Sequence, residues 1–367
     1  MKRRTLVGVA GLLAVTVMGV AGVSAAEKSD TDPKHQLPRP DGKPADMKKP
    51  VKVFILLGQS NMVGMGNVSG GEGSLENAVK TKGKYAYLVD QAGAWAERKD
   101  VRFVQYMSGK GPLRNEFLVV KPGKMGVEYA VGHCLGDAID APVMILKACI
   151  GNRSLAWDLL PPGSERFVEG GKVYAGYKDR PDSWAADPAK GKATEPPPWL
   201  GKDGKPVQWW AGLQYDADVG DAKKALAELD KHYPGATKYE VAGFFFWQGE
   251  KDAGNPVHAS HYEQNLVAFI KALRKDFNAP NAKFVLATLG ETTKGSGGNG
   301  GKVLEAQLAV DGTSGKHPEF KGNVATVYSN PMAQGGSGNG HYGGKAEVYM
   351  DVGEAIGQAM VELLGSK

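Results

Sequence analysis

The chain has 367 residues, of which 42% are hydrophobic and 23% charged, a composition typical of a globular protein with one large or two small domains. Its formal net charge is +5, and it has no basic stripe with interleaved aromatic residues, which argues against nucleic acid as a partner. The two cysteines, Cys134 and Cys149, cannot form a four-ligand zinc site by themselves. They could pair in an exported protein, but a domain of this size needs no disulfide.

The N-terminal residues predict an export signal rather than part of the fold. Residues 1–4 are basic, residues 6–23 are apolar with several glycines, and residues 23–26 offer small side chains for cleavage. We therefore expect a signal peptide over residues 1–25, a secreted or periplasmic protein, and no stable membrane span after cleavage; an uncleaved anchor is the alternative. Cleavage would remove three basic residues and lower the net charge to about +2. Residues 26–49 are rich in Lys, Pro, Asp and Gly and predict a flexible linker.

The folded domain is expected to span residues 50–367 and to begin with a strand. Residues 51–57 are a continuous apolar run, which is typical of a strand buried on both faces of a parallel sheet. Further strands are predicted at residues 143–148, 241–246, 283–287 and 324–328, and helices near residues 127–140, 216–232, 262–275 and 346–364. This alternation predicts an α/β fold with one parallel sheet covered by helices on both sides.

Residues 161–214 interrupt the alternation with an insertion rich in Trp and Pro. An irregular segment of this length is usually functional or disordered, and its tryptophans argue against disorder. Their rings could stack on sugar rings, although packing of the loop itself explains one or two of them equally well. The four are Trp184, Trp199, Trp209 and Trp210. The glycine-rich residues 295–301 and 335–340 are expected to be mobile loops, and the second leads into His341.

Polar residues follow three of the predicted strands. They lie at residues 58–62 (GQSNM), 151–154 (GNRS) and 247–250 (WQGE), and a fourth polar element, residues 339–341, precedes the last helix. Ligands of parallel α/β sheets gather beyond the carboxyl ends of the strands, so these elements predict one site.

A serine hydroxyl becomes a nucleophile when a base removes its proton and a carboxylate orients the base. Ser60, His341 and Glu250 could fill these roles in that order. The developing oxyanion needs fixed donors, which the Ser60 and Gly151 N–H groups and the side-chain amide of Gln248 or Asn61 could supply. Singly, each residue also has a structural explanation: Ser60 as a helix cap, Glu250 as a cap or a partner of Lys251.

The first polar element resembles the first block of the SGNH (GDSL-type) hydrolases, in the branch of sialate O-acetylesterases and acetylxylan esterases. Residues 145–155 resemble the second block, with Gly151 in place of a double glycine. Residues 247–250 resemble the third block, and His341-Tyr342 with residues 345–349 the last one. The blocks run in order from about residue 51 to 364.

Two departures from the resemblance matter. Many SGNH enzymes carry an Asp three residues before the catalytic His, and here that position is Gly338. In the acetylxylan-esterase-like branch a third-block Glu takes that role, and Glu250 matches it. The serine element is also not the Gly-x-Ser-x-Gly elbow of α/β-hydrolases, because Met62 stands at the second glycine.

The resemblance implies a flavodoxin-like three-layer α/β/α sandwich and a serine carbohydrate esterase that removes O-acetyl groups from a glycan, of the acetylxylan or sialate type, through an acyl-enzyme. Further residues of the blocks are expected to contact the substrate: Gln59, Asn61, Asn152, Arg153 and Trp247. No cofactor is expected. His258 and His261 lack the ligands that would complete a metal site, so no metal is expected either. The alternatives are a non-catalytic carbohydrate-binding protein on the same fold, or an esterase acting on non-sugar esters.

Overall fold

The computed structural model describes residues 37–107, 110–189 and 191–365. The predicted signal peptide and the first part of the predicted linker lie outside these residues. Residues 37–50 contain no helix or strand, but Arg39 Nε donates to the carbonyls of Ala86 at 3.2 Å and Val89 at 3.0 Å. Within the described chain, no helix combines the length and apolarity needed to cross a bilayer.

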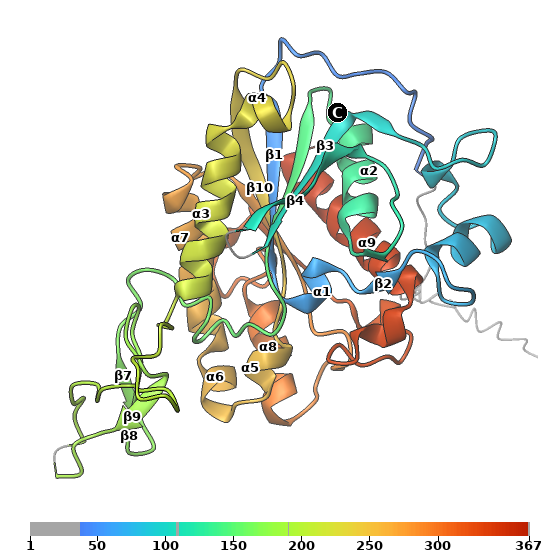
Figure 1. Cartoon of the computed structure of the whole chain (residues 1–367). Coiled ribbons are helices and arrows are strands. Elements are labelled where there is room, and N and C mark those ends of the chain that lie inside the picture. The colour runs from blue at the N-terminus through green and yellow to red at the C-terminus, as the bar shows by residue number, and fades with distance from the viewer. Residues whose placement is uncertain (1–36, 108–109, 190, 366–367) are drawn as a thin grey trace, which may run out of the picture. The chain divides into compact units, whose positions relative to one another are not determined.

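A seven-stranded sheet forms the centre of the described residues, in the order β12–β11–β10–β1–β6–β3–β4 (Figure 1). All neighbouring strands are parallel except β3 and β4, which form an antiparallel hairpin at one edge. The strands are β1 (Val51–Gly58), β3 (Arg98–Met107), β4 (Lys110–Leu118), β6 (Val143–Ala148), β10 (Tyr239–Trp247), β11 (Lys283–Ala287) and β12 (Val324–Val327).

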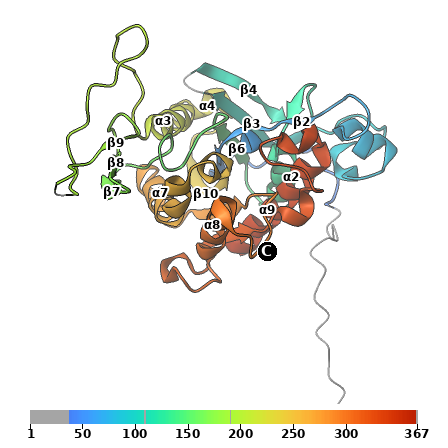
Figure 2. The ribbon, with the colours of Figure 1, turned by 90° about the horizontal axis from the view of Figure 1, so that it is seen from below.

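Helices cover both faces of this sheet, as Figure 2 shows along its edge. Alternate residues of β1 point to opposite sides. Phe54 and Leu56 pack in the core that includes α2 (Glu128–Ala138) and α9 (Ala346–Leu364). Val53, Ile55 and Leu57 pack in the core of α3 (Leu213–Ala227), α7 (Tyr262–Asp276) and α8 (Gly298–Ala309). The predicted three-layer α/β/α sandwich is therefore confirmed, and the apolar run of β1 follows from burial on both faces.

Two local expectations are wrong, and one hairpin was missed. The β3–β4 hairpin was not predicted, because an edge strand such as β4 carries charged and polar residues instead of an apolar run. The helix expected over residues 216–232 is two helices, α3 and α4 (Leu229–His232), separated at Glu228. The glycine-rich residues 298–301, expected in a loop, form the first turn of α8.

The insertion carries a three-stranded antiparallel sheet of its own. Its strands are β7 (Phe167–Glu169), β8 (Lys172–Tyr174) and β9 (Ser183–Ala185). Trp184 packs with Val173 and Leu160 in a small separate core, and its Nε1 donates to the carbonyl of Thr194 at 2.9 Å. The insertion is thus a small folded lobe beside the main sheet (Figure 1).

Short elements complete the described chain. They are α1 (Ser60–Val63), β2 (Gly66–Asn67), a π-helix (Asn77–Thr81), β5 (Lys124–Met125), α5 (Glu250–Ala253), α6 (Pro256–Ser260), and 3-10 helices at Ala86–Leu88, Pro318–Phe320, Asn330–Met332 and His341–Gly344. Cys134 and Cys149 are both buried and free.

Candidate active site

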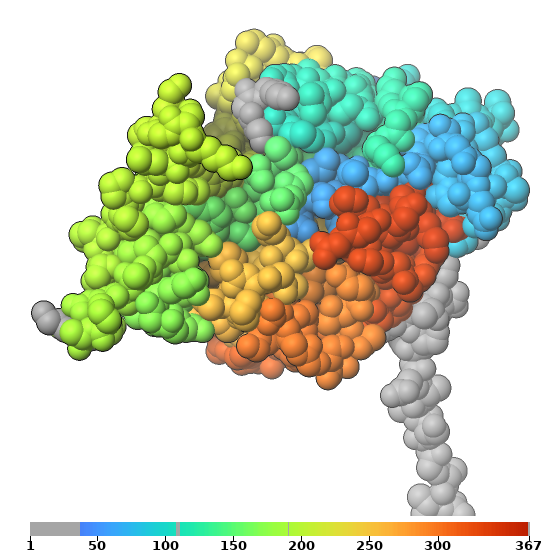
Figure 3. Space-filling model, turned by 60° about the horizontal axis from the view of Figure 1, so that its bottom comes forward, coloured from blue at the N-terminus to red at the C-terminus, as the bar shows by residue number. Residues whose placement is uncertain are grey.

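The three predicted strand-end elements meet at one end of the sheet. Because β10, β1 and β6 are adjacent and parallel, the segments after them lie side by side. They border a cavity of about 940 Å³, and Figure 3 shows this face, where segments from distant parts of the chain converge. Its lining includes Gln59, Ser60, Gly151, Asn152, Arg153, Glu250, Asn339 and His341.

Ser60 is the first residue of α1, directly after β1, and is partly exposed to the cavity. Gly151 lies against it: a Cβ at position 151 would sit 3.3 Å from the Cβ of Ser60, tighter than ordinary contact. Within the described residues, neither the Ser60 nor the Gly151 N–H donates to a backbone carbonyl. Both N–H groups are therefore free to bind an oxyanion beside the Ser60 hydroxyl.

Glu250 is buried, with 3% of its surface exposed, and holds the residues on both sides of Ser60. One carboxylate oxygen accepts from Nε2 of Gln59 at 2.6 Å, and the other accepts from Nδ2 of Asn61 at 2.6 Å. Burial raises the pKa of Glu250 to about 7, and the charge of Glu291 adds to this effect. The carboxylate thus fixes the turn that carries the serine.

Gly338 occupies the position at which SGNH enzymes commonly place an Asp. A Cβ there would lie 2.5 Å from Oε1 of Glu250 and 2.6 Å from Oε2 of Glu291. The Gly338 N–H donates to Glu291 Oε2 at 2.9 Å, and the Gly338 carbonyl accepts from Asn61 Nδ2 at 3.1 Å. Glu250 therefore fills the space that a side chain at position 338 would need.

Glu291 was not predicted as part of the site. It follows β11, so its position after a further parallel strand was the available signal. A single carboxylate in a run of Gly and Thr carries too little pattern to be recognised from the sequence alone.

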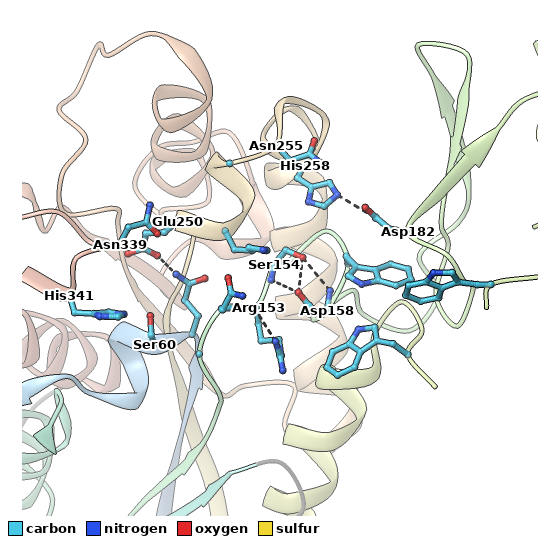
Figure 4. Close-up of a pocket in the computed structure, with 18 residues that line it drawn as sticks. Ser60, Arg153, Ser154, Asp158, Asp182, Glu250, Asn255, His258, Asn339 and His341 are labelled. Atoms are coloured by element: carbon cyan, nitrogen blue, oxygen red, sulfur yellow. Dashed lines mark hydrogen bonds and ion pairs between the residues drawn. The ribbon is translucent and has the colours of Figure 1, made fainter. Parts of the chain in front are cut away.

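His341 lies across the cavity from the insertion, near Ser60 (Figure 4). It and Tyr342 both have φ of 51°, a left-handed conformation that non-glycine residues rarely adopt. The buried Tyr342 ring stacks on Trp247 at 5.8 Å, and the Tyr349 hydroxyl donates to the His341 carbonyl at 3.4 Å. This packing holds the histidine at the cavity wall.

The His341 ring makes no hydrogen bond or ion pair within the described residues. Glu250 instead binds the amides of Gln59 and Asn61, and the carboxylate of Asp351, in α9, accepts from the Tyr85 hydroxyl. The structure therefore brings Ser60, His341 and Glu250 to one cavity without a direct contact between the base and the acid.

Gln248 does not reach the cavity, contrary to its expected role as an oxyanion donor. Its Nε2 donates to the Arg153 carbonyl at 2.9 Å and to Oδ2 of Asp252 at 2.6 Å. Its Oε1 accepts from the Tyr262 hydroxyl at 2.8 Å. Both amide hydrogens are thus engaged beneath the site, and we leave Gln248 out of the oxyanion hole.

Of the five residues expected to contact substrate, three line the cavity and two do not. Gln59, Asn152 and Arg153 line the cavity, and the buried Oε1 of Gln59 has no donor within the described residues. Asn61 and Trp247 do not line it: Asn61 Oδ1 accepts from the Tyr349 hydroxyl, and Trp247 Nε1 donates to the Thr288 carbonyl. Polar and aromatic residue types gave no indication of which side chains point inward.

The other end of the cavity is lined by tryptophans. Trp199 and Trp209 of the insertion face it together with Trp157, which follows β6. Trp184 and Trp210, also considered for sugar stacking, do not line it; Trp210 Nε1 donates to Asp216 at 3.4 Å. Asp182 of the insertion approaches Nε2 of His258 at 3.5 Å (Figure 4).

The α/β/α sandwich and a serine, histidine and carboxylate around one cavity fit the hydrolase class that the sequence blocks resemble. Residues 201–362 match the model of a family described as "Carbohydrate esterase, sialic acid-specific acetylesterase". This match confirms the predicted resemblance to sialate O-acetylesterases, over a span that contains Glu250 and His341 but not Ser60 or Gly151.

Among solved structures, the chain resembles a protein from Arabidopsis thaliana with 17% identity and a TM-score of 0.47, over 86% of this chain and 99% of that one. A carbohydrate acetylesterase from Xanthomonas citri gives 14% identity and a TM-score of 0.46, over 85% of this chain and 55% of the other. The protein NanS gives 15% identity and a TM-score of 0.34, over 65% of this chain and 68% of the other. No match was found among curated protein sequences.

Proposed function

We propose that this chain is a secreted serine esterase that removes O-acetyl groups from a glycan through an acyl-enzyme. The observation that carries the proposal is the convergence of Ser60, Gly151, Glu250 and His341 on one cavity, from four distant parts of the sequence. The family match over residues 201–362 supports the carbohydrate substrate, and the predicted signal peptide supports secretion.

In the proposed reaction, His341 takes the proton of the Ser60 hydroxyl while its oxygen attacks the acetyl carbonyl. The Ser60 and Gly151 N–H groups bind the oxyanion. Collapse of the tetrahedral intermediate releases the sugar hydroxyl, which receives the proton from His341. Water, deprotonated by His341, then attacks the acyl-enzyme and frees acetate and Ser60.

Glu250 acts in this scheme as the acid that stabilises the charged His341. For that role its carboxylate and the imidazole must approach each other when substrate binds, because hydrogen bonds of catalytic groups often tighten only in the complex. The Glu250 carboxylate meanwhile keeps the Ser60 turn in place through Gln59 and Asn61.

The experiment is hydrolysis of p-nitrophenyl acetate by the parent and by Ser60→Ala. The loss should be on the order of 10³-fold or more in kcat, because the nucleophile is removed. A fluorophosphonate probe should add one covalent group to the parent and none to the variant, as read by intact mass. If the parent is inactive, or if the variant keeps its activity, the proposal fails. A non-catalytic carbohydrate-binding protein would then be the better interpretation.

A series of p-nitrophenyl esters of increasing chain length tests the acyl group. The proposed substrate carries an acetyl group, so the acetate ester should be the best substrate of the series. Preference for long acyl chains would favour an esterase acting on non-sugar esters.

A further inference from the structure

The far end of the cavity has the features of a second sugar-binding position. One continuous cavity of about 940 Å³ runs from Ser60 and His341 to Trp157, Trp199 and Trp209. Ligand sites in proteins typically measure about 300–1,000 Å³, so this one lies at the upper end of the range. An acetyl group and the single sugar that carries it would leave the tryptophan end empty.

The tryptophans form walls rather than a buried core. All three keep part of their surface exposed, and Trp157 also packs against the small core of the lobe. The rings of Trp157 and Trp199 meet edge to face, with centroids 6.2 Å apart and planes at 66°. Two nearly perpendicular planes suit a sugar, whose C–H face packs on one ring while its rim meets the other.

Trp209 is held by a different contact. The Arg153 guanidinium lies 4.7 Å from its ring centre, and Arg153 Nε donates to Gln214 at 3.2 Å. The indole Nε1 of Trp209 is shielded from solvent and has no acceptor within the described residues.

The tryptophan end is also linked to the rest of the fold. Asp182 in the lobe approaches His258 in α6 at 3.5 Å, and both residues line the cavity. In Figure 4 this pair lies on the side opposite His341 and Ser60, with Arg153 between the two sides. The lobe therefore presents its aromatic residues toward the same space that the serine faces.

We infer that the substrate is an oligomer: the acetylated sugar lies at Ser60, and a neighbouring sugar of the same chain stacks on Trp199 and Trp157. This inference rests on the proposed function and adds to it a position that selects for chain length. Trp199 comes from the insertion and so makes the insertion a determinant of specificity.

The test compares kcat/KM for an acetylated oligosaccharide with that for the matching acetylated monosaccharide. Two pairs serve as probes, one neutral (acetylated xylotetraose and acetylated xylose) and one acidic (O-acetylated sialyllactose and O-acetylated N-acetylneuraminic acid). The parent should prefer the oligomer in one of the two pairs by about 10-fold, equivalent to about 1.4 kcal/mol of binding in the transition state. The pair that shows the preference identifies the class of glycan.

Trp199→Ala should reduce that ratio to near one, and Trp199→Phe, which keeps an aromatic plane, should retain most of it. Trp210→Ala is the matched control, because Trp210 lies in the same segment but does not line the cavity. Its ratio should equal that of the parent. If Trp199→Ala fails to fold, the Phe variant and the parent ratios still decide the matter.

The inference is overturned if the parent has the same kcat/KM for oligosaccharide and monosaccharide in both pairs. It is also overturned if Trp199→Ala keeps the parent's preference for the oligosaccharide. Either result would leave the acyl chemistry untouched, since that is measured separately with p-nitrophenyl acetate and Ser60→Ala. If the parent itself does not hydrolyse p-nitrophenyl acetate, the proposed function is refuted, and the inference that rests on it falls as well.

Discussion

The two ends of the cavity are built in different ways. At the Ser60 end, Ser60, Gly151 and Glu250 each follow a strand of the main sheet, whereas His341 lies just before α9. Buried hydrogen bonds to Glu250 fix the serine turn on both sides. At the tryptophan end, the partly exposed rings of Trp199 and Trp209 lie on a lobe with its own small core. Ion pairs join this lobe to α6 and the residue after it, from Asp182 to His258 at 3.5 Å and from Glu169 to His261 at 2.8 Å.

The strand ends of the main sheet and the lobe are therefore suited to different properties of the enzyme. Residues at the ends of adjacent strands cannot move independently, so they suit chemistry that needs ångström-scale placement. Rings on a lobe can be changed or exchanged without disturbing the sheet, so they suit selection among glycans. Mutations at the first end should abolish turnover, whereas mutations at the second should mainly alter preference.

The largest effect in this comparison is expected from Glu250→Gln. If the carboxylate stabilises His341 and fixes the Ser60 turn, kcat on p-nitrophenyl acetate should fall on the order of 10³-fold with the fold intact. Circular dichroism and steady-state kinetics are the measurements. Glu291→Gln is the comparison variant, and a greater loss there than at Glu250 would assign the orienting role to Glu291.

The second prediction concerns how the free energy of unfolding depends on pH. Burial raises the pKa of Glu250 from its ordinary 4.5 to about 7, so the folded protein binds this proton more tightly than the unfolded chain. The resulting stabilisation is complete below about pH 4.5 and is lost as pH rises through about 7, by roughly 3 kcal/mol.

Glu250→Gln should remove this dependence, because the amide does not titrate. The free energy of unfolding, measured by denaturant titration at pH 5 and pH 8, should therefore shift in favour of the variant at pH 8. An equal difference between parent and variant at both pH values would contradict a raised pKa at this position.

A smaller effect is expected from Gly151→Ala. The added methyl would lie 3.3 Å from the Ser60 Cβ and must displace it by a few tenths of an ångström. Turnover should fall on the order of 10-fold, less than the roughly 10²-fold cost of a 1 Å displacement. Gly220→Ala in α3, where no atom lies within 4 Å of the new methyl, is the control and should keep full activity.

The smallest effect is expected at the link between the lobe and α6. Burial lowers the pKa of His258, but Asp182 and Asp252 raise it by more, so its pKa lies above the ordinary 6.5. The stabilisation is thus present below about pH 6.5 and lost as pH rises through the folded pKa. Asp182→Asn should cost less than about 1 kcal/mol at pH 6, because Asp182 is 40% exposed, and nothing at pH 9.

Thermal unfolding at the two pH values checks this expectation. Asp203→Asn, in an exposed turn of the same insertion, should show no such difference between pH 6 and pH 9. A loss at Asp182 that is equally large at both pH values would show that the pair contributes through packing rather than charge.

Much of the fold followed from the sequence because burial leaves a clear pattern. The apolar runs of β1, β6 and β11 and the amphipathic α9 are where the pattern placed them. The β3–β4 hairpin was missed because β4 lies at an edge, where polar residues meet solvent.

The site was predictable to the level of segments but not of side-chain direction. Ser60, Gly151 and Glu250 line one cavity because parallel strands bring their carboxyl ends together, and the loop before α9 adds His341. The inward or outward direction of Gln248 depends on Tyr262 and Asp252, partners that no local pattern identifies. The contribution of Trp157 was likewise invisible, because it depends on where the insertion folds back.

The missing side chain at position 338 has a consequence for how such sites can diverge. A side chain at position 338 would occupy the space that the Glu250 carboxylate fills, so the two carboxylates cannot be present together. Gly338→Asp alone should disrupt the site through collision and charge repulsion, and shortening Glu250 alone should remove the acid. Made together, the two changes should restore an orienting carboxylate, provided that the Glu291 side chain, 2.6 Å from the added Cβ, also moves aside. Positions 250 and 338 are therefore expected to show sign epistasis. Each single change should lower activity, so an evolving lineage would pass from one arrangement to the other through a variant of low activity.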